Sequence, residues 1–425
     1  MKSSGVKWIG EIPQDWDTHR IKLDYAIYAG ATPKSKKKEY WDGNVNWVTP
    51  SDFKTEDKFV STGKRNLSAE GLDACSASML PVGSIIFSKR APIGTVAIST
   101  EKLSTNQGCL GCVPKKNANS TFAYYCMSVA VDEFNIRGQG TTFMEISTKD
   151  FSVIKMPYPS RNEQEAIVHY LDSCCTAIDR TLIAARKSIQ KLEEYKASLI
   201  TKAVTRGLNP MVEMQKIAED WIGKMPKHWK YMRTKYLFEI LKRIAGKKGY
   251  DILAITQRGI EVKDISTNKG QIAADYSKYQ LVYPGDFAMN HMDLLTGWMD
   301  LSDKTGVTSP DYRVFRKCSP LVYNEYYRYV FQNLYTTRVY YGLAQGVAEV
   351  GRKRLQAPAF RNFRLPVPPL DEQKAIVAYL DKETAAIDRL IAQKQQLIEK
   401  FTEYKQSLIY AAVTGKIDCR EEALK

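Results

Sequence analysis

The chain has 425 residues, enough for several domains, and its 44% hydrophobic content is ordinary for a globular protein. No apolar run approaches the roughly 20 residues that span a bilayer, and the first residues do not resemble a secretory signal. We therefore expect a cytoplasmic protein. The net charge of +15 favours nucleic acid as a partner over a basic protein merely kept soluble by self-repulsion.

The first region, residues 1–158, contains a motif that the chain repeats. WIGEIPQDW at Trp8–Trp16 returns as WIGKMPKHW at Trp221–Trp229, with two Trp, an Ile-Gly and a Pro at the same spacing. Short apolar runs separated by turns predict a mainly β domain with peripheral helices. Residues 83–100 predict two strands around a loop that contains Pro and Gly.

Residues 159–207 predict a long helix, and residues 369–416 predict a second one of almost the same sequence. EQ-AIV-YLD, AIDR, EYK-SLI and AVT recur in both. Apolar residues in 3-4 alternation indicate a coiled-coil seam about 65 Å long at about 1.5 Å per residue. We expect the two helices to pair antiparallel. The alternative is that each docks on its own globular domain.

The seam of the second helix and the starts of both helices are also predictable. Thr384 and Lys394 interrupt its seam, so packing there should be looser or solvent-facing. Asn162 and Asp371, each just before a Glu, are candidate N-caps.

A linker at 208–217 leads to a second globular domain at 218–368, and residues 417–425 form a tail. Residues 284–302 occupy the place that 83–100 hold in the first domain. The chain is thus a duplication with matched ends and divergent middles. We predict an α+β fold in which two similar globular domains are separated by two long helices packed as an antiparallel coiled coil, with a pseudo-two-fold relationship between the halves.

Catalytic motifs are missing. The sequence has no Asn/Asp-Pro-Pro-aromatic methyltransferase motif, no phosphate loop of the Gly-x-x-x-x-Gly-Lys-Ser/Thr type and no nuclease pattern of spaced acids and Lys. CLGC at Cys109–Cys112 stands alone, so buried thiols are favoured over a zinc site. We therefore expect a non-catalytic chain without a metal.

Taken together, the doubled WIG--P--W, the doubled P-P---EQ-AIV-YLD----AIDR and the closing EYK-SLI--AVT resemble the DNA-specificity subunits of type I restriction–modification systems. The resemblance covers nearly the whole chain. It implies two target-recognition domains, each reading one half of a split, asymmetric DNA sequence, with the helical spacer setting the gap.

The resemblance also implies partners. Modification subunits, two of them, would carry an adenine methyltransferase, and restriction subunits would complete a nuclease. S-adenosylmethionine, ATP and Mg would then belong to those partners, with no cofactor in this chain. Two alternatives stay open: a specificity subunit of a methylation-only or other bipartite system, and a coiled-coil scaffold without sequence-specific DNA binding.

No motif marks the base-reading residues, so we choose candidates by chemistry. Arg and Lys bind phosphates and guanine, and Gln or Asn pairs with adenine. In the first domain the candidates lie in FSKRAP and RGQGTT: Ser88, Lys89, Arg90, Arg137, Gln139 and Thr141. In the second domain they lie in KR, MNHMD and GRKR: Lys242, Arg243, Asn290, His291, Arg352, Lys353 and Arg354.

Overall fold

The computed structural model describes residues 1–139, 144–263, 275–295, 297–344 and 353–420. The chain forms two compact units. The first comprises Met1–Ala185 and Gln396–Lys425, and the second comprises Arg186–Gln395. Each unit therefore contains one globular domain and a portion of each long helix.

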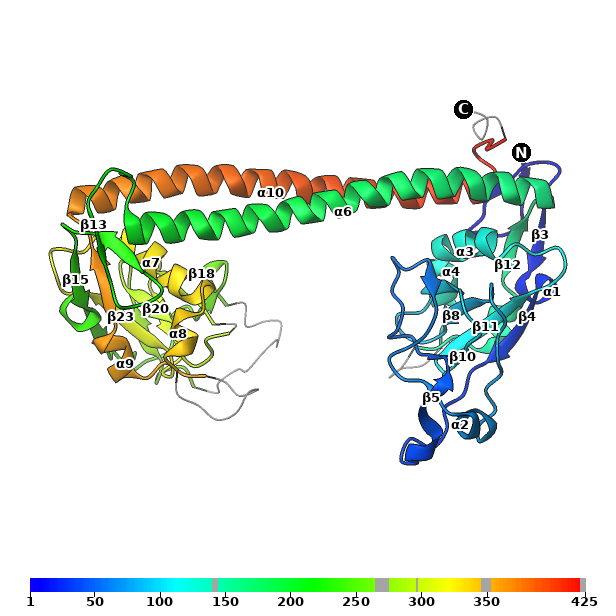
Figure 1. Ribbon diagram of the computed structural model, residues 1–425, viewed down its shortest axis with the longest axis horizontal. Helices are drawn as coiled ribbons and strands as arrows, with labels where there is room; N and C mark the ends of the chain where they lie inside the picture. Colours follow the sequence, from blue (N-terminus) through cyan, green and yellow to red (C-terminus); the bar gives the residue numbers. More distant parts are fainter. Residues whose placement is uncertain (140–143, 264–274, 296, 345–352, 421–425) are drawn as a thin grey trace. The chain divides into compact units, whose positions relative to one another are not determined.

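The first unit is built on a five-stranded sheet in the order β4-β11-β8-β9-β7 (Figure 1). Its strands are β4 Tyr25–Ala29, β7 Phe59–Val60, β8 Ile85–Ser88, β9 Val96–Ser99 and β11 Cys109–Pro114. β7 pairs parallel with β9, and the other neighbours pair antiparallel. The strands β8 and β9 are fully buried, as expected for hairpin strands at the centre of a two-sided core.

The smaller elements of this unit surround the sheet. The short strands are β1 Lys2–Ser3, β2 Glu11–Ile12, β3 Asp17–Arg20, β5 Trp41–Val45, β6 Trp47–Val48, β10 Ser104–Thr105 and β12 Lys155–Tyr158. The helices are α1 Ile21–Asp24, η1 Lys38–Tyr40, α2 Ala69–Asp73, α3 Ser120–Val129, α4 Val131–Ile136 and α5 Thr148–Ser152.

Both faces of this sheet are covered by apolar clusters. One cluster contains Leu110 and Cys112 and extends through α3 into the long helices. The other contains Cys109 and Ile86. Cys109 and Cys112 therefore face opposite sides of β11, as positions i and i+3 of a strand must. Both thiols are buried and free, and burial raises their pKa well above the ordinary value.

The second unit repeats this plan with a four-stranded sheet in the order β16-β23-β20-β21. These strands are β16 Phe238–Leu241, β20 Phe287–Met289, β21 Met299–Leu301 and β23 Arg313–Lys317. The other strands are β13 Met214–Lys216, β14 Lys224–Pro226, β15 Lys230–Arg233, β17 Leu253–Thr256, β18 Gly259–Val262, β19 Gln280–Val282, β22 Gly306–Thr308 and β24 Arg364–Val367. The helical elements are η2 Thr234–Tyr236, α7 Asn324–Thr336, α8 Val339–Gly342 and α9 Ala357–Asn362.

The expected pair of hairpins is confirmed. β8 pairs antiparallel with β9, and β20 pairs antiparallel with β21. Gly83 and Gly285 lie two residues before the first strand of each hairpin and have nearly the same positive φ, 83° and 88°. Phe87 and Met289 are therefore equivalent positions in the two units.

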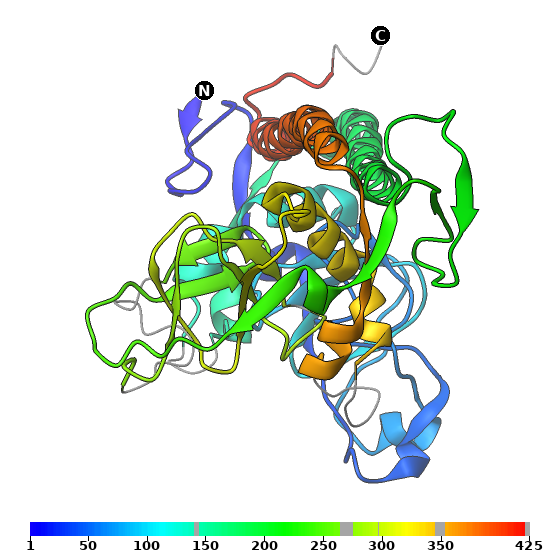
Figure 2. The ribbon, with the colours of Figure 1, turned by 90° about the vertical axis from the view of Figure 1, so that its left-hand side faces the viewer.

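The long helices are α6 Arg161–Arg206 and α10 Leu370–Val413. In the first unit, Lys405 Nζ lies 2.6 Å from Asp179 Oδ1. In the second, Lys196 Nζ lies 2.7 Å from Asp388 Oδ1. Each contact joins an early position of one helix to a late position of the other, so the two helices run antiparallel in both units (Figures 1 and 2).

The predicted seam of α6 is most deeply buried where it also meets the first globular domain, from Leu171 to Ala185. Beyond it, Ile189 and Leu192 are half-buried. In α10, the prediction of looser or solvent-facing packing was wrong at Thr384, which is only 7% exposed. Its hydroxyl donates to the Leu380 carbonyl at 2.7 Å, which removes the polar cost of burying it.

The predicted caps were also misplaced. Because α6 begins at Arg161, Asn162 lies within its first turn. Ser160 is the capping residue: its Oγ donates to Glu163 Oε2 at 2.9 Å, and its backbone amide donates to the same oxygen at 3.2 Å. Asp371 likewise lies inside α10, which begins at Leu370.

Candidate nucleic-acid interface

In the first unit, three of the predicted DNA-binding residues lie at the end of β8, with Ser88 the last residue of the strand and Lys89 and Arg90 in the loop after it. Ser88 is buried, and its hydroxyl donates to the Arg90 carbonyl at 2.9 Å. Lys89 Nζ and Arg90 Nε each lie 2.7 Å from a carboxylate oxygen of Glu145. Partial burial raises the pKa of the Glu145 carboxyl. The hydrogen bonds from Lys89 and Arg90 have the larger combined effect, so the pKa is lowered from its ordinary value. Ser88 thus shapes the loop and is withdrawn as a candidate for DNA contact.

The structure brings this loop together with the second predicted segment of the first domain. The backbone of Gln139 exchanges two hydrogen bonds with that of Glu145, at 2.9 and 3.0 Å. The Ile146 amide then donates to the Lys89 carbonyl at 3.0 Å. Arg137 pairs with Glu133 at 2.7 Å across one helical turn. Thr141 lies outside the described residues.

In the second unit, the loop after β20 carries Asn290 and His291. The Leu355 amide donates to the His291 carbonyl at 3.0 Å, and the Leu294 amide donates to the Lys353 carbonyl at 3.3 Å. Two predicted segments, Asn290–His291 and Lys353–Arg354, therefore form one platform. Arg352 lies outside the described residues.

The two platforms are equivalent. His291 and Lys89 both lie two residues beyond the equivalent positions Met289 and Phe87. The His291 carbonyl accepts a backbone hydrogen bond from the Leu355 amide, and the Lys89 carbonyl accepts one from the Ile146 amide. The same backbone hydrogen bond thus presents different side chains in the two units.

Lys242 and Arg243 follow β16. Because β16 and β20 both pair antiparallel with β23, their C-terminal ends lie at the same end of the sheet. Lys242 is exposed there. Arg243 instead forms an ion pair with the buried Asp286 and lies over the Tyr283 ring, 4.7 Å from its centroid. This arrangement indicates a structural role for Arg243.

Sequence reasoning missed two residues of these platforms, Glu145 and Arg313. Glu145 neutralises the first platform. Arg313 is 5% exposed, lies on β23 and donates to the Leu355 carbonyl at 2.9 Å beneath the second platform. An arginine inside the alternating apolar pattern of a strand was the only sequence signal for it.

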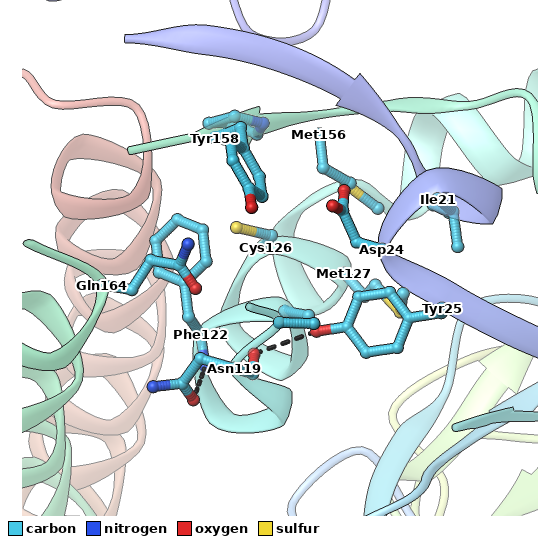
Figure 3. Close-up of a pocket in the computed structure, with 13 residues that line it drawn as sticks. Ile21, Asp24, Tyr25, Asn119, Phe122, Cys126, Met127, Met156, Tyr158 and Gln164 are labelled. Atoms are coloured by element: carbon cyan, nitrogen blue, oxygen red, sulfur yellow. Dashed lines mark hydrogen bonds between the residues drawn. The ribbon is translucent and has the colours of Figure 1, made fainter. Parts of the chain in front are cut away.

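A pocket of about 30 Å³ beneath α6 in the first unit holds no catalytic arrangement (Figure 3). Figure 3 shows the Tyr25 hydroxyl pointing to Asn119, whose carbonyl accepts its hydrogen at 3.0 Å. Asn119 itself caps α3. Cys126 borders the pocket, but complete burial raises the pKa of its thiol well above the ordinary value, which opposes a nucleophilic role. The volume suits a water molecule or two rather than a substrate.

Within the part of the chain that the structure describes, no three His, Cys, Asp or Glu residues are grouped so as to hold a metal ion. No described helix combines the length and apolar character needed to cross a membrane.

Each of the two similar α+β units carries a platform of polar and charged side chains at one end of its sheet. This arrangement is typical of proteins that bind another molecule through polar contacts. A model of the family described as type I restriction modification DNA specificity domain matches residues 13–194 and 226–400. The chain therefore belongs to the type I restriction modification DNA specificity family, and the resemblance drawn from the repeated motifs is confirmed.

Named relatives agree. The type I restriction enzyme MjaIX specificity subunit of Methanocaldococcus jannaschii is 34% identical over 246 residues, which cover 56% of this chain and about half, 54%, of that relative. The MjaVIII specificity subunit of the same organism is 21% identical over 425 residues, 96% of this chain and 94% of that relative. Both are named for specificity, which agrees with the prediction that this chain is non-catalytic.

A solved structure shows the same fold. A chain described under complex assembly and conformational transition of the type I R-M system superposes with a TM-score of 0.70, covering 96% of this chain and 100% of that one. The two chains are only 13% identical. The predicted fold class is thus confirmed.

Proposed function

We propose that this chain is the sequence-reading subunit of a type I restriction–modification complex and that each globular domain reads one half of a bipartite, asymmetric DNA target. The observation that carries the proposal is the pair of equivalent platforms. One backbone hydrogen bond is the same in both, from Ile146 to Lys89 and from Leu355 to His291, while Lys89 is replaced by His291 and Glu145 by Arg354. Conserved scaffolding with altered side chains at one sheet end fits two readers of different sequences.

The matched long helices support the second part of the proposal, recruitment of partners. A duplicated helix pair offers the same surface twice, and two copies of one partner can use it while the target remains asymmetric. The partners proposed are modification subunits with adenine methyltransferase activity, accompanied by restriction subunits. S-adenosylmethionine, ATP and Mg belong to those partners in this proposal.

The DNA-binding residues in this proposal are Lys89, Arg90, Arg137 and Gln139 in the first domain and Lys242, Asn290, His291, Lys353 and Arg354 in the second. Thr141 and Arg352 stay in the set as sequence predictions. Ser88 and Arg243 leave it because each is committed to contacts inside the protein.

The test is single-molecule sequencing of DNA from cells with and without the gene, scored for N6-methyladenine. Loss of methylation at one split motif, with a fixed gap and two unlike halves, is the expected result. A methylation pattern that is identical in both cells would favour the scaffold without sequence-specific DNA binding. Detection of DNA cleavage in the same cells separates a full restriction system from a methylation-only one.

A further inference from the structure

The second unit contains a buried arginine where the first unit has a leucine. Leu110 pairs with Phe87, and Arg313 pairs with the equivalent Met289. Leu110 is fully buried in the apolar cluster, and Arg313 is 5% exposed. One unit has therefore placed a permanent positive charge at a core position that the other fills with a hydrocarbon side chain.

Arg313 forms no ion pair with any residue that the structure describes. Its guanidinium donates to the Leu355 carbonyl and lies over the Phe360 ring, 4.9 Å from its centroid. Among the residues that the structure describes, no carboxylate lies within 4.0 Å of it. Burial lowers its pKa to about 10, so it remains charged at neutral pH. Burying a charge without a counter-ion is costly, and a hydrogen bond to one carbonyl and an aromatic face offset only part of that cost.

A second cation lies beside it. Arg354 is exposed, directly precedes Leu355 and has no carboxylate partner among the described residues. Burial lowers the pKa of the His291 imidazole, and the charges of Arg313 and Arg354 lower it further, so both arginines act on the same side chain. The platform of the second unit thus brings together two arginines that form no ion pair within the described part of the chain.

The first unit shows the compensated form of the same arrangement. Glu145 directly precedes Ile146, as Arg354 directly precedes Leu355, and it forms ion pairs with both Lys89 and Arg90. Among the described residues, a carboxylate pairs with the platform cations of the first unit, and none pairs with Arg313 or Arg354 in the second. A ligand that complements these two cations carries a negative charge, which a phosphate has and a base edge does not.

We propose that Arg313 and Arg354 form a phosphate-binding site for the DNA backbone in the second unit. Arg354 contacts the phosphate. Arg313 is a positioning residue that holds the Leu355 segment and adds positive potential behind it. This inference rests on the proposed function, because it takes DNA as the ligand of the platform.

The test is the salt dependence of DNA binding by the chain assembled with its modification partner. Two duplexes are compared, one with the motif found by methylation sequencing and one with that motif scrambled. Each phosphate contact contributes about 0.9 to the slope of log K against log salt concentration. Arg354→Gln should lower the slope by about one on both duplexes.

Arg313→Leu, which installs the residue of the first unit, should weaken binding to both duplexes while the unfolding temperature stays equal or rises. Arg313→Lys should restore most of the binding, because it keeps the charge. Arg316→Gln is the matched control: Arg316 lies on the same strand but pairs with Glu239 at 2.6 Å, so its slope should not change.

An unchanged slope for Arg354→Gln or an unchanged affinity for Arg313→Leu would overturn the phosphate site, as would a loss of discrimination between duplexes with no change in slope. Failure of the proposed function gives a different result. In that case the unaltered complex would bind the two duplexes equally.

Discussion

Trp16 donates its indole N–H to Glu163 in the first turn of α6, with 3.2 Å between Nε1 and Oε1. The second unit repeats this relationship, where Trp229 Nε1 lies 2.9 Å from Glu372 Oε2 in the first turn of α10. Trp16 also lies against Gly415, just beyond the end of α10, and Trp229 lies against Gly207, just beyond the end of α6. The repeated WIG--P--W motif thus holds the start of one long helix beside the end of the other, in both units.

Replacing Trp16 with Phe should destabilise the protein by about 1–2 kcal/mol, because the change removes a hydrogen bond to the charged carboxylate of Glu163. Glu163 then keeps its cap contacts and its ion pair with Arg420. Urea unfolding of the full chain measures the difference. Trp41→Phe is the control, since the buried indole N–H of Trp41 has no acceptor in the structure. An equal decrease in the free energy of unfolding in the two variants would show that the hydrogen bond from Trp16 to Glu163 adds no stability beyond the packing of the ring.

Gly415→Ala should be more damaging than Gly207→Ala. Both glycines have positive φ, 70° and 73°, which costs an alanine roughly 1 kcal/mol or more. A Cβ on Gly415 would lie 2.4 Å from Pro13 Cδ, whereas one on Gly207 would lie 3.1 Å from the Trp229 ring. Gly83→Ala isolates the backbone contribution, because its φ is 83° and no atom lies within 4 Å of the added methyl. Thermal unfolding that ranks Gly83→Ala worst would contradict the steric explanation.

His291 should make the protein less stable as the pH falls below about 6.5. Burial, aided by Arg313 and Arg354, lowers the pKa of its imidazole from 6.5 to about 3. Between these values the unfolded chain binds a proton at His291 and the folded chain does not, so acid favours unfolding. Denaturation at pH 7.5 and pH 5 should show a smaller decrease for His291→Gln than for the unaltered protein. Parallel decreases would mean that His291 is protonated in the folded protein.

Much of the fold could be predicted because the chain contains each sequence pattern twice. The repeated Trp motif, the EQ-AIV-YLD helices and the hairpins at 83–100 and 284–302 each appear twice, so a pattern that is weak once becomes specific. The platforms were partly predictable for the same reason, since Lys89 and His291 follow matched strands. The short apolar runs of β8 and β20 were enough to locate the loops after them.

The remaining features depend on contacts between distant segments. Ser88 looked like a loop-tip donor, yet it ends a buried strand and its hydroxyl is used within the turn. Thr384 looked like a break in the seam, yet the Tyr329 side chain of α7 covers it, with 3.5 Å between the two hydroxyl oxygens. The ion pairs of Glu145 join residues 55 positions apart or more, and no local pattern reports such a pairing.

The continuity of α6 and α10 leads to a prediction about target spacing. If the helix pair sets the gap between half-sites, four extra residues in each helix, inserted between Arg186 and Lys191 and at the facing positions of α10, should lengthen it by about 6 Å. That equals nearly two base pairs at about 3.4 Å each. Methylation sequencing should therefore return the same two half-sites with a gap about two base pairs longer.

Four residues make 1.1 helical turns and rotate one half by about 40°, so the expected activity of the insertion variant is reduced but not lost. A matched control replaces four exposed residues of the same segments by alanine without changing the length, and it should leave the gap unchanged. An insertion variant that methylates the original motif with its original gap would show that something other than the helix pair measures the distance. The half-sites would then be positioned by the partner subunits, and the long helices would serve only to bind them.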